Sequence, residues 1–135
     1  MQNLMINHLA VFVCAVLSLA LGALWYSPTL FYRAWLRETR LSEEQLATSN
    51  PAVIYGLTFI FALVISYNLA FFLGDGQTTP LWGATAGFLA GFGWSTLIFA
   101  MIALFERRSW RYICINGGFI TVYFTLIGFI LGAWR

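Results

Sequence analysis

The sequence predicts an all-α integral membrane protein, built as a single domain of four transmembrane helices with a short interfacial helix between the first two. The 135-residue chain is 61% hydrophobic and only 9% charged, whereas an ordinary soluble domain has about 25% charged residues. Four apolar stretches are long enough to cross a hydrocarbon core of roughly 30 Å, and they cover approximately residues 9–26, 52–73, 81–105 and 112–134. Because lipid offers the backbone no hydrogen-bond partner, each stretch must be helical.

The first apolar stretch ends in Trp25-Tyr26-Ser27-Pro28, and no Lys or Arg precedes it. A secretory signal would begin with basic residues and end in a cleavage site of small residues. We therefore expect this helix to be retained as the first transmembrane span.

Residues 28–41 predict a short helix that lies in the membrane interface. Ser27 can cap this helix and Pro28 can take its first position, where a missing N–H costs nothing. The spacing puts apolar side chains on one face and arginines on the other; these are Leu30, Phe31, Ala34, Trp35 and Leu41, against Arg33, Arg37 and Arg40. The turn and anchor of this membrane exit are predicted to be Trp25, Tyr26, Ser27, Pro28, Phe31 and Trp35.

Two further helix starts precede the second span. The sequence Ser42-Glu43-Glu44-Gln45 fits a capping box, in which the first and fourth residues satisfy each other's backbone N–H groups. Ser49-Asn50-Pro51 supplies a cap and a first-turn proline for the second span.

The basic residues are all arginines, and their placement predicts the topology. Two loops hold six of the seven: Arg33, Arg37 and Arg40 after the first span, and Arg107, Arg108 and Arg111 between the third and fourth. The positive-inside rule places both loops in the cytoplasm. We therefore expect a multi-pass protein of the inner membrane with both termini non-cytoplasmic. The same six arginines are candidates to contact anionic lipid headgroups, since each cation near the surface contributes about 1 kcal/mol.

Small residues predict where the helices pack. Membrane helices associate where small side chains let the backbones approach, and a spacing of four relates Gly83, Gly87 and Gly91 in the third span and Gly128 and Gly132 in the fourth. The third span carries Gly and Ala on several faces. One face can therefore pack inside the bundle while another meets a second subunit, and the sequence leaves both uses open.

Several polar or amphipathic side chains lie within the spans. The candidates for a polar path or cleft are Asn68, Trp94, Ser95, Thr96 and Asn116. An amide carries donors and an acceptor, so both asparagines can instead serve as structural hydrogen-bonding groups between helices.

The residues exclude several kinds of chemistry. The chain has no Lys for an imine and one His, His8, so we expect no lysine-bound cofactor, haem or other metal site. The acidic residues lie in loops or at helix ends, where they cannot serve a proton path at depth; they are Glu38, Glu43, Glu44, Asp75 and Glu106. No nucleophile with its base can be assembled, so no enzymatic activity is expected. A net charge of +2 gives no support for nucleic-acid binding.

Four motifs resemble a known family. They are Gly22-x-x-Trp25-Tyr26-Ser27-Pro28-x-x-Phe31-x-x-x-Trp35, Phe105-x-x-Arg108-x-Trp110, Asn116-x-Gly118 and Gly128-x-x-x-Gly132-x-Trp134. This pattern is similar to the small bacterial and fungal membrane proteins grouped as domain of unknown function 1761. The resemblance spans nearly the whole chain and implies four helices in one domain, but no activity, because the family has none assigned. Where most members carry Lys in the first loop, this chain has Arg, which holds phosphate and carboxylate groups more tightly.

Three functions are compatible with these features. The leading hypothesis is a non-enzymatic protein that acts through helix packing, as a homo-oligomer or as an accessory subunit of a larger membrane complex. The alternative is a channel or transporter for a neutral or weakly polar small solute. The third is a lipid- or quinone-binding protein that uses the aromatic clusters.

Overall fold

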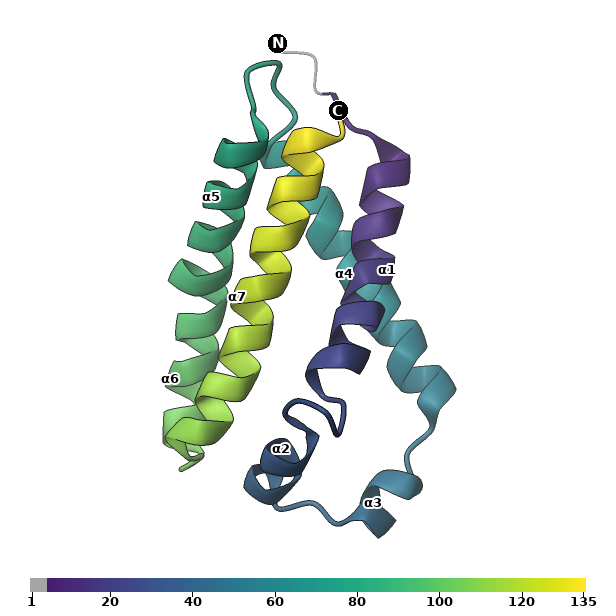
Figure 1. The fold of residues 1–135 in the computed structure, drawn as a ribbon, viewed down its shortest axis with the longest axis vertical. Coiled ribbons are helices and arrows are strands. Elements are labelled where there is room, and N and C mark those ends of the chain that lie inside the picture. The colour runs from purple at the N-terminus through teal and green to yellow at the C-terminus, as the bar shows by residue number, and fades with distance from the viewer. Residues whose placement is uncertain (1–4) are drawn as a thin grey trace.

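The computed structural model describes residues 5–135 and is all-α (Figure 1). In this part of the chain, four helical stretches are long and apolar enough to cross a membrane: α1 (His8–Trp25), α4 (Pro51–Phe72), Pro80–Phe105 and α7 (Trp110–Ala133). The third stretch consists of α5 (Pro80–Ala90), a π-helical segment η1 (Gly91–Thr96) and α6 (Leu97–Phe105). Two short helices, α2 (Tyr32–Thr39) and α3 (Glu43–Ala47), join α1 to α4. The predicted fold class is confirmed.

The capping signals before α3 and α4 act as predicted. The Ser42 hydroxyl accepts the Gln45 N–H at 3.0 Å, and the Gln45 side chain accepts the Ser42 N–H at 2.8 Å. The Asn50 side chain accepts the N–H groups of Ala52 and Val53, and Pro51 takes the first helical position. These contacts satisfy N–H groups that have no partner inside the helix.

The helix predicted over residues 28–41 corresponds to α2, which starts later than predicted, at Tyr32 instead of Pro28, and Ser27 is not its cap. Residues 27–31 form turns in which the Ser27 carbonyl accepts the N–H groups of Leu30 and Tyr32. The Phe31 N–H returns to the Trp25 carbonyl at 3.2 Å, and the two rings lie 4.9 Å apart. The chain therefore turns back on the end of α1 over residues 27–31 where a helix was expected from Pro28.

The long helices associate as two pairs, α1 with α4 and α5 with α7. The pairs meet through α1 and α7, whereas α4 makes almost no contact with α5. In Figure 1 the C-terminus and the α4–α5 loop lie at one end of the bundle, and α2, α3 and the α6–α7 loop lie at the other. We call this second end the arginine end, because it holds Arg33, Arg37, Arg40, Arg107, Arg108 and Arg111.

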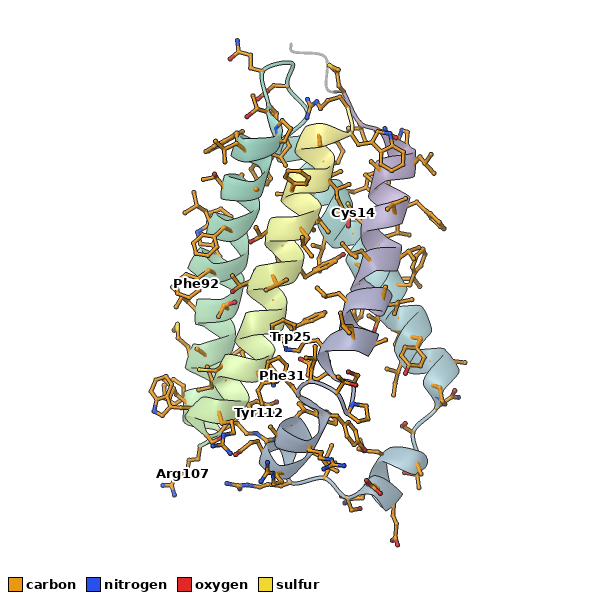
Figure 2. All side chains as sticks on the ribbon, viewed as in Figure 1. Cys14, Trp25, Phe31, Phe92, Arg107 and Tyr112 are labelled. Carbon is orange, nitrogen blue, oxygen red and sulfur yellow. The ribbon has the colours of Figure 1, made fainter. Side chains whose placement is uncertain are left out.

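The core lies between α1, α4 and α7. Cys14 and Ile127 are fully buried there, and Figure 2 shows Cys14 on α1 at this position. The Tyr123 hydroxyl crosses the core and donates to the Cys14 carbonyl at 2.9 Å. Because hydrocarbon offers no competing partner, such a bond ties α7 to α1.

The loop between α4 and α5 is held by Asp75 and Arg135. The Asp75 carboxylate accepts the Thr78 hydroxyl and the Gln77 N–H, both at 2.9 Å. The Arg135 guanidinium donates to the Leu73 carbonyl at 2.5 Å and to the Asp75 carbonyl. The carbonyl groups just after the end of α4 therefore have a partner from the end of the chain.

This loop is expected to lose stability in acid. The hydrogen bonds from Thr78 and Gln77, with the nearby charge of Arg135, lower the pKa of Asp75 from its ordinary value of 3.8. A carboxylate with a lowered pKa stabilises the folded state above the ordinary value, and this contribution disappears as the pH falls through the folded-state value. D75N should therefore flatten the decline in melting temperature between about pH 5 and pH 2. If the melting temperatures of D75N and wild type decline equally over this pH range, the prediction is contradicted.

Candidate functional site

The glycines of α5 and α7 pack against one another inside the chain. A Cβ on Gly83 would lie 2.2 Å from the Gly128 carbonyl oxygen, and a Cβ on Gly87 would lie 2.1 Å from that of Phe124. Gly91 faces the Phe124 side chain, and Gly132 faces the Thr79 carbonyl. The backbones are therefore in direct contact along this seam, and the face of α5 that carries these glycines is covered by α7.

Thr96 belongs to the same seam. Its hydroxyl lies 3.1 Å from the Gly117 carbonyl oxygen and 3.0 Å from the Thr121 hydroxyl, in a buried position. A Cβ on Gly117 would lie 2.8 Å from the Thr96 methyl group, so a small residue is needed opposite. Thr96, one of the candidates for a polar path, therefore faces α7 and does not line the groove described below.

Trp25 and Tyr26 join the end of α1 to α7. The Trp25 indole N–H donates to the Ile115 carbonyl at 2.9 Å, and the Tyr26 hydroxyl donates to the Asn116 side chain at 2.5 Å. The Trp25 ring lies against Gly118, where a Cβ would come within 2.9 Å of it. The Asn116 side chain thus contacts the membrane exit, as a hydrogen-bonding group between helices would.

An aromatic cluster surrounds this junction, and Figure 2 shows Trp25 and Phe31 beside each other near the end of α1. The rings of Tyr26 and Trp35 lie 5.8 Å apart, and those of Tyr26 and Phe119 lie 5.7 Å apart. The residues predicted as interfacial anchors therefore also pack inward. Sequence reasoning missed Phe119. The signal that could have pointed to it is the neighbouring Gly118, which lies outside the four-residue glycine spacing of α7 and makes room for the Trp25 ring.

The two arginine-bearing loops contact each other at the arginine end. The Arg108 guanidinium donates to the Thr39 carbonyl at 3.2 Å and lies 5.0 Å from the centre of the Tyr112 ring. The Ser109 hydroxyl donates to the Glu38 carboxylate at 2.6 Å. Of the six predicted lipid-contacting arginines, Arg108 is thus engaged within the protein. The other five are exposed: Arg33, Arg37, Arg40, Arg107 and Arg111.

A groove separates α4 from α5 and η1. Its volume is about 670 Å³, and its lining residues are Ile65, Asn68, Leu69, Phe72, Leu73, Trp82, Ala86, Leu89, Ala90, Gly93, Trp94, Ser95 and Phe124. Of the five predicted path residues, the structure brings three together here: Asn68, Trp94 and Ser95. Phe124 of α7 contributes from between the two walls.

The π-helical segment η1 determines which side chains reach the groove. A π-helix closes its hydrogen bonds over five residues, so it turns more widely than an α-helix and is frequent at functional sites. Within η1, Gly91 and Thr96 are buried against α7, whereas Trp94 is 71% exposed and lines the groove with Ser95. The sequence predicted one uninterrupted α-helix here and missed this segment.

The groove is apolar, and its neutral hydrogen-bonding side chains are Asn68, Ser95 and the indole N–H groups of Trp82 and Trp94. Within residues 5–135, neither Asn68 nor Ser95 makes a side-chain hydrogen bond, unlike Thr96, which is bonded to α7. The described residues contain no group of His, Cys, Asp and Glu able to hold a metal ion. Such a surface fits an apolar partner that brings hydrogen-bonding groups of its own, either a helix face or a lipid-like molecule.

Comparison with known proteins identifies a family. No curated protein matches the chain, and no solved structure matches it. The model of a family described as "Protein of unknown function (DUF1761)" matches residues 9–132. This range contains the four long apolar helices except His8 and Ala133, together with the contacts of Trp25 and Tyr26 to α7 and the groove. The chain therefore belongs to the DUF1761 family of proteins of unknown function.

Proposed function

We propose that this protein is a non-enzymatic, homo-oligomeric membrane protein in which a second copy closes the groove between α4 and α5. The observation that carries the proposal is the state of Asn68 and Ser95, which face the groove without a hydrogen-bonding partner among the described residues. An amide in hydrocarbon is costly unless it is paired. Lipid tails alone cannot pair these groups, whereas a helix with polar side chains can.

The distribution of buried surface supports the same face. In the most apolar 18-residue stretch of α4 and of Pro80–Phe105, 17% is buried inside the protein, compared with 33% in the corresponding stretch of α7. The glycine stripe Gly83, Gly87 and Gly91 is already covered by α7, so it is not the surface offered to a second copy. The groove lies between α4 and α5, which make almost no contact with each other, so this face is left open to a second copy.

Two-fold symmetry would let this face complete itself. In a two-fold dimer the same surface patch of both subunits meets. The Asn68 side chain of one copy can then bond to Ser95 or Asn68 of the other copy. Trp82 and Trp94 line the groove and supply large aromatic contact area, which is enriched at protein interfaces.

Cysteine cross-linking tests this face directly. In a C114S background, L89C places a thiol in the groove, whereas V16C places one on the exposed side of α1. We expect oxidation in native membranes to cross-link L89C into dimers and to leave V16C monomeric, because only the groove faces a second copy. Equal cross-linking of both variants would indicate random collision, and a monomeric L89C would contradict the proposal.

The other functions receive less support from the structure. A solute path would need Thr96 and Asn116, but their side chains are engaged at the α5–α7 seam and at the membrane exit. A lipid or quinone in the groove remains the competing occupant. Native mass spectrometry separates the two, since it would then show a monomer that retains the ligand instead of a dimer.

The orientation in the membrane is part of the proposal. The two arginine-bearing loops share one end of the bundle, opposite the C-terminus (Figure 1). The positive-inside rule supports a cytoplasmic arginine end in the inner membrane, with both termini on the non-cytoplasmic side.

A further inference from the structure

We infer that the two arginine-bearing loops form one continuous surface that binds the phosphate groups of anionic phospholipids. This inference is independent of the groove and of oligomerisation. It rests on how the loops are joined, on which charges remain exposed, and on the apolar side chains beside those charges.

The loops are joined by contacts that leave most arginines available. Arg108 reaches the Thr39 carbonyl, and Ser109 reaches the Glu38 carboxylate at 2.6 Å. One arginine therefore ties the loops together, and Glu38 is occupied by a hydroxyl instead of by a guanidinium. Five guanidinium groups stay exposed without a hydrogen bond to any described residue: Arg33, Arg37 and Arg40 from one loop, and Arg107 and Arg111 from the other.

The net charge of this surface is positive. Its acidic members are Glu38, already bound by Ser109, and Glu106, so arginines outnumber carboxylates. Glu43 and Glu44 lie in the first turn of α3, which Figure 1 shows at the end of α4, away from the α6–α7 loop. Guanidinium groups bind phosphate oxygens through paired hydrogen bonds.

Neighbouring apolar groups indicate a lipid phosphate in preference to a soluble anion. Phe105 is 89% exposed and lies two residues before Arg107, and Trp110 is 68% exposed and directly precedes Arg111. Exposed aromatic residues at the end of a membrane helix belong at the level of the headgroups. A surface that sets cations beside lipid-exposed rings suits an amphiphile, whose phosphate meets the arginines while its acyl chains meet the rings.

Native mass spectrometry of the full chain tests the inference. The protein is released from nanodiscs that contain phosphatidylcholine with a rising fraction of phosphatidylglycerol, and the retained lipids are counted. We compare R33Q/R37Q, R107Q/R111Q and the combined variant with E43Q/E44Q, which alters charge at the same end. Because each surface cation contributes about a fivefold preference, either arginine pair should reduce the phosphatidylglycerol preference roughly 20- to 30-fold, and E43Q/E44Q should not reduce it.

A double-mutant cycle decides whether the surface is continuous. If one headgroup contacts both loops, both arginine pairs act on the same bound lipid, so their fold-losses multiply in the combined variant. If each pair variant instead retains one phosphatidylglycerol with wild-type preference, the loops hold separate lipids and the single surface is overturned; arginine variants that behave as E43Q/E44Q would overturn lipid binding. Inorganic phosphate is added as a competitor, and complete displacement of phosphatidylglycerol by it would assign the site to a free anion. Unchanged melting temperatures verify that all variants are folded.

Discussion

Replacing Gly128 by alanine is expected to push α5 and α7 apart and to lower the free energy of unfolding by about 3 kcal/mol or more. The added Cβ would lie 2.1 Å from the Gly83 carbonyl oxygen and 3.1 Å from the Gly87 Cα. Both neighbours are backbone atoms, so no side-chain rotation can relieve the overlap. Since membrane helices gain little from hydrophobic burial, close backbone packing is a main source of their association.

Gly56 provides the matched control for this substitution. It lies in α4 with no atom within 4 Å of the position a Cβ would take. Alanine is the better helix former by about 1 kcal/mol, so G56A should be as stable as wild type or more stable. Unfolding in mixed micelles of increasing denaturing detergent, followed by circular dichroism, compares the variants. If G128A and G56A are half unfolded at the same detergent fraction, the close packing of α5 against α7 is contradicted.

The sequence was sufficient for the four long helices, because hydropathy and end signals are local. The four apolar stretches matched the helices to within two residues at each end, and the caps at Ser42 and Asn50 formed as expected. The Ser27-Pro28 signal failed, although it is of the same kind. The Phe31 ring packs on Trp25, and the Trp25 indole donates to Ile115 of α7, so this turn involves a helix that the local signal does not contain.

The candidate sites were only partly predictable, for a related reason. Spacing shows which residues share a helix face, but not which helix lies opposite. It therefore found the stripes of Gly83 and Gly128 without showing that they meet. It also grouped Thr96 with Ser95, although η1 turns one toward α7 and the other toward the groove. The π-helical turn and the separation of α4 from α5 arise from packing across the whole bundle.

Exchanging Trp25 and Tyr26 is the substitution that best separates a membrane anchor from a packing site. A simple anchor tolerates the exchange, because both residues suit the interface. The structure predicts a loss of about 2–4 kcal/mol, since two interhelical hydrogen bonds, each contributing roughly 0.6 kcal/mol and at most about 1.7, would disappear and a misfitted ring would add strain. The bonds at stake are those from Trp25 to Ile115 and from Tyr26 to Asn116.

The control for this exchange is W110Y, which alters an aromatic residue that is 68% exposed and should cost little. Asn116 supplies a second check through a double-mutant cycle. N116A should lower the unfolding free energy of the wild type by about 1 kcal/mol, because it leaves the Tyr26 hydroxyl unpaired. In the exchanged protein this hydroxyl has already lost its place, so N116A should have almost no further effect. Full additivity of the two changes would mean that Trp25 and Tyr26 hold α1 only through the lipid interface, and that the contact with α7 contributes nothing.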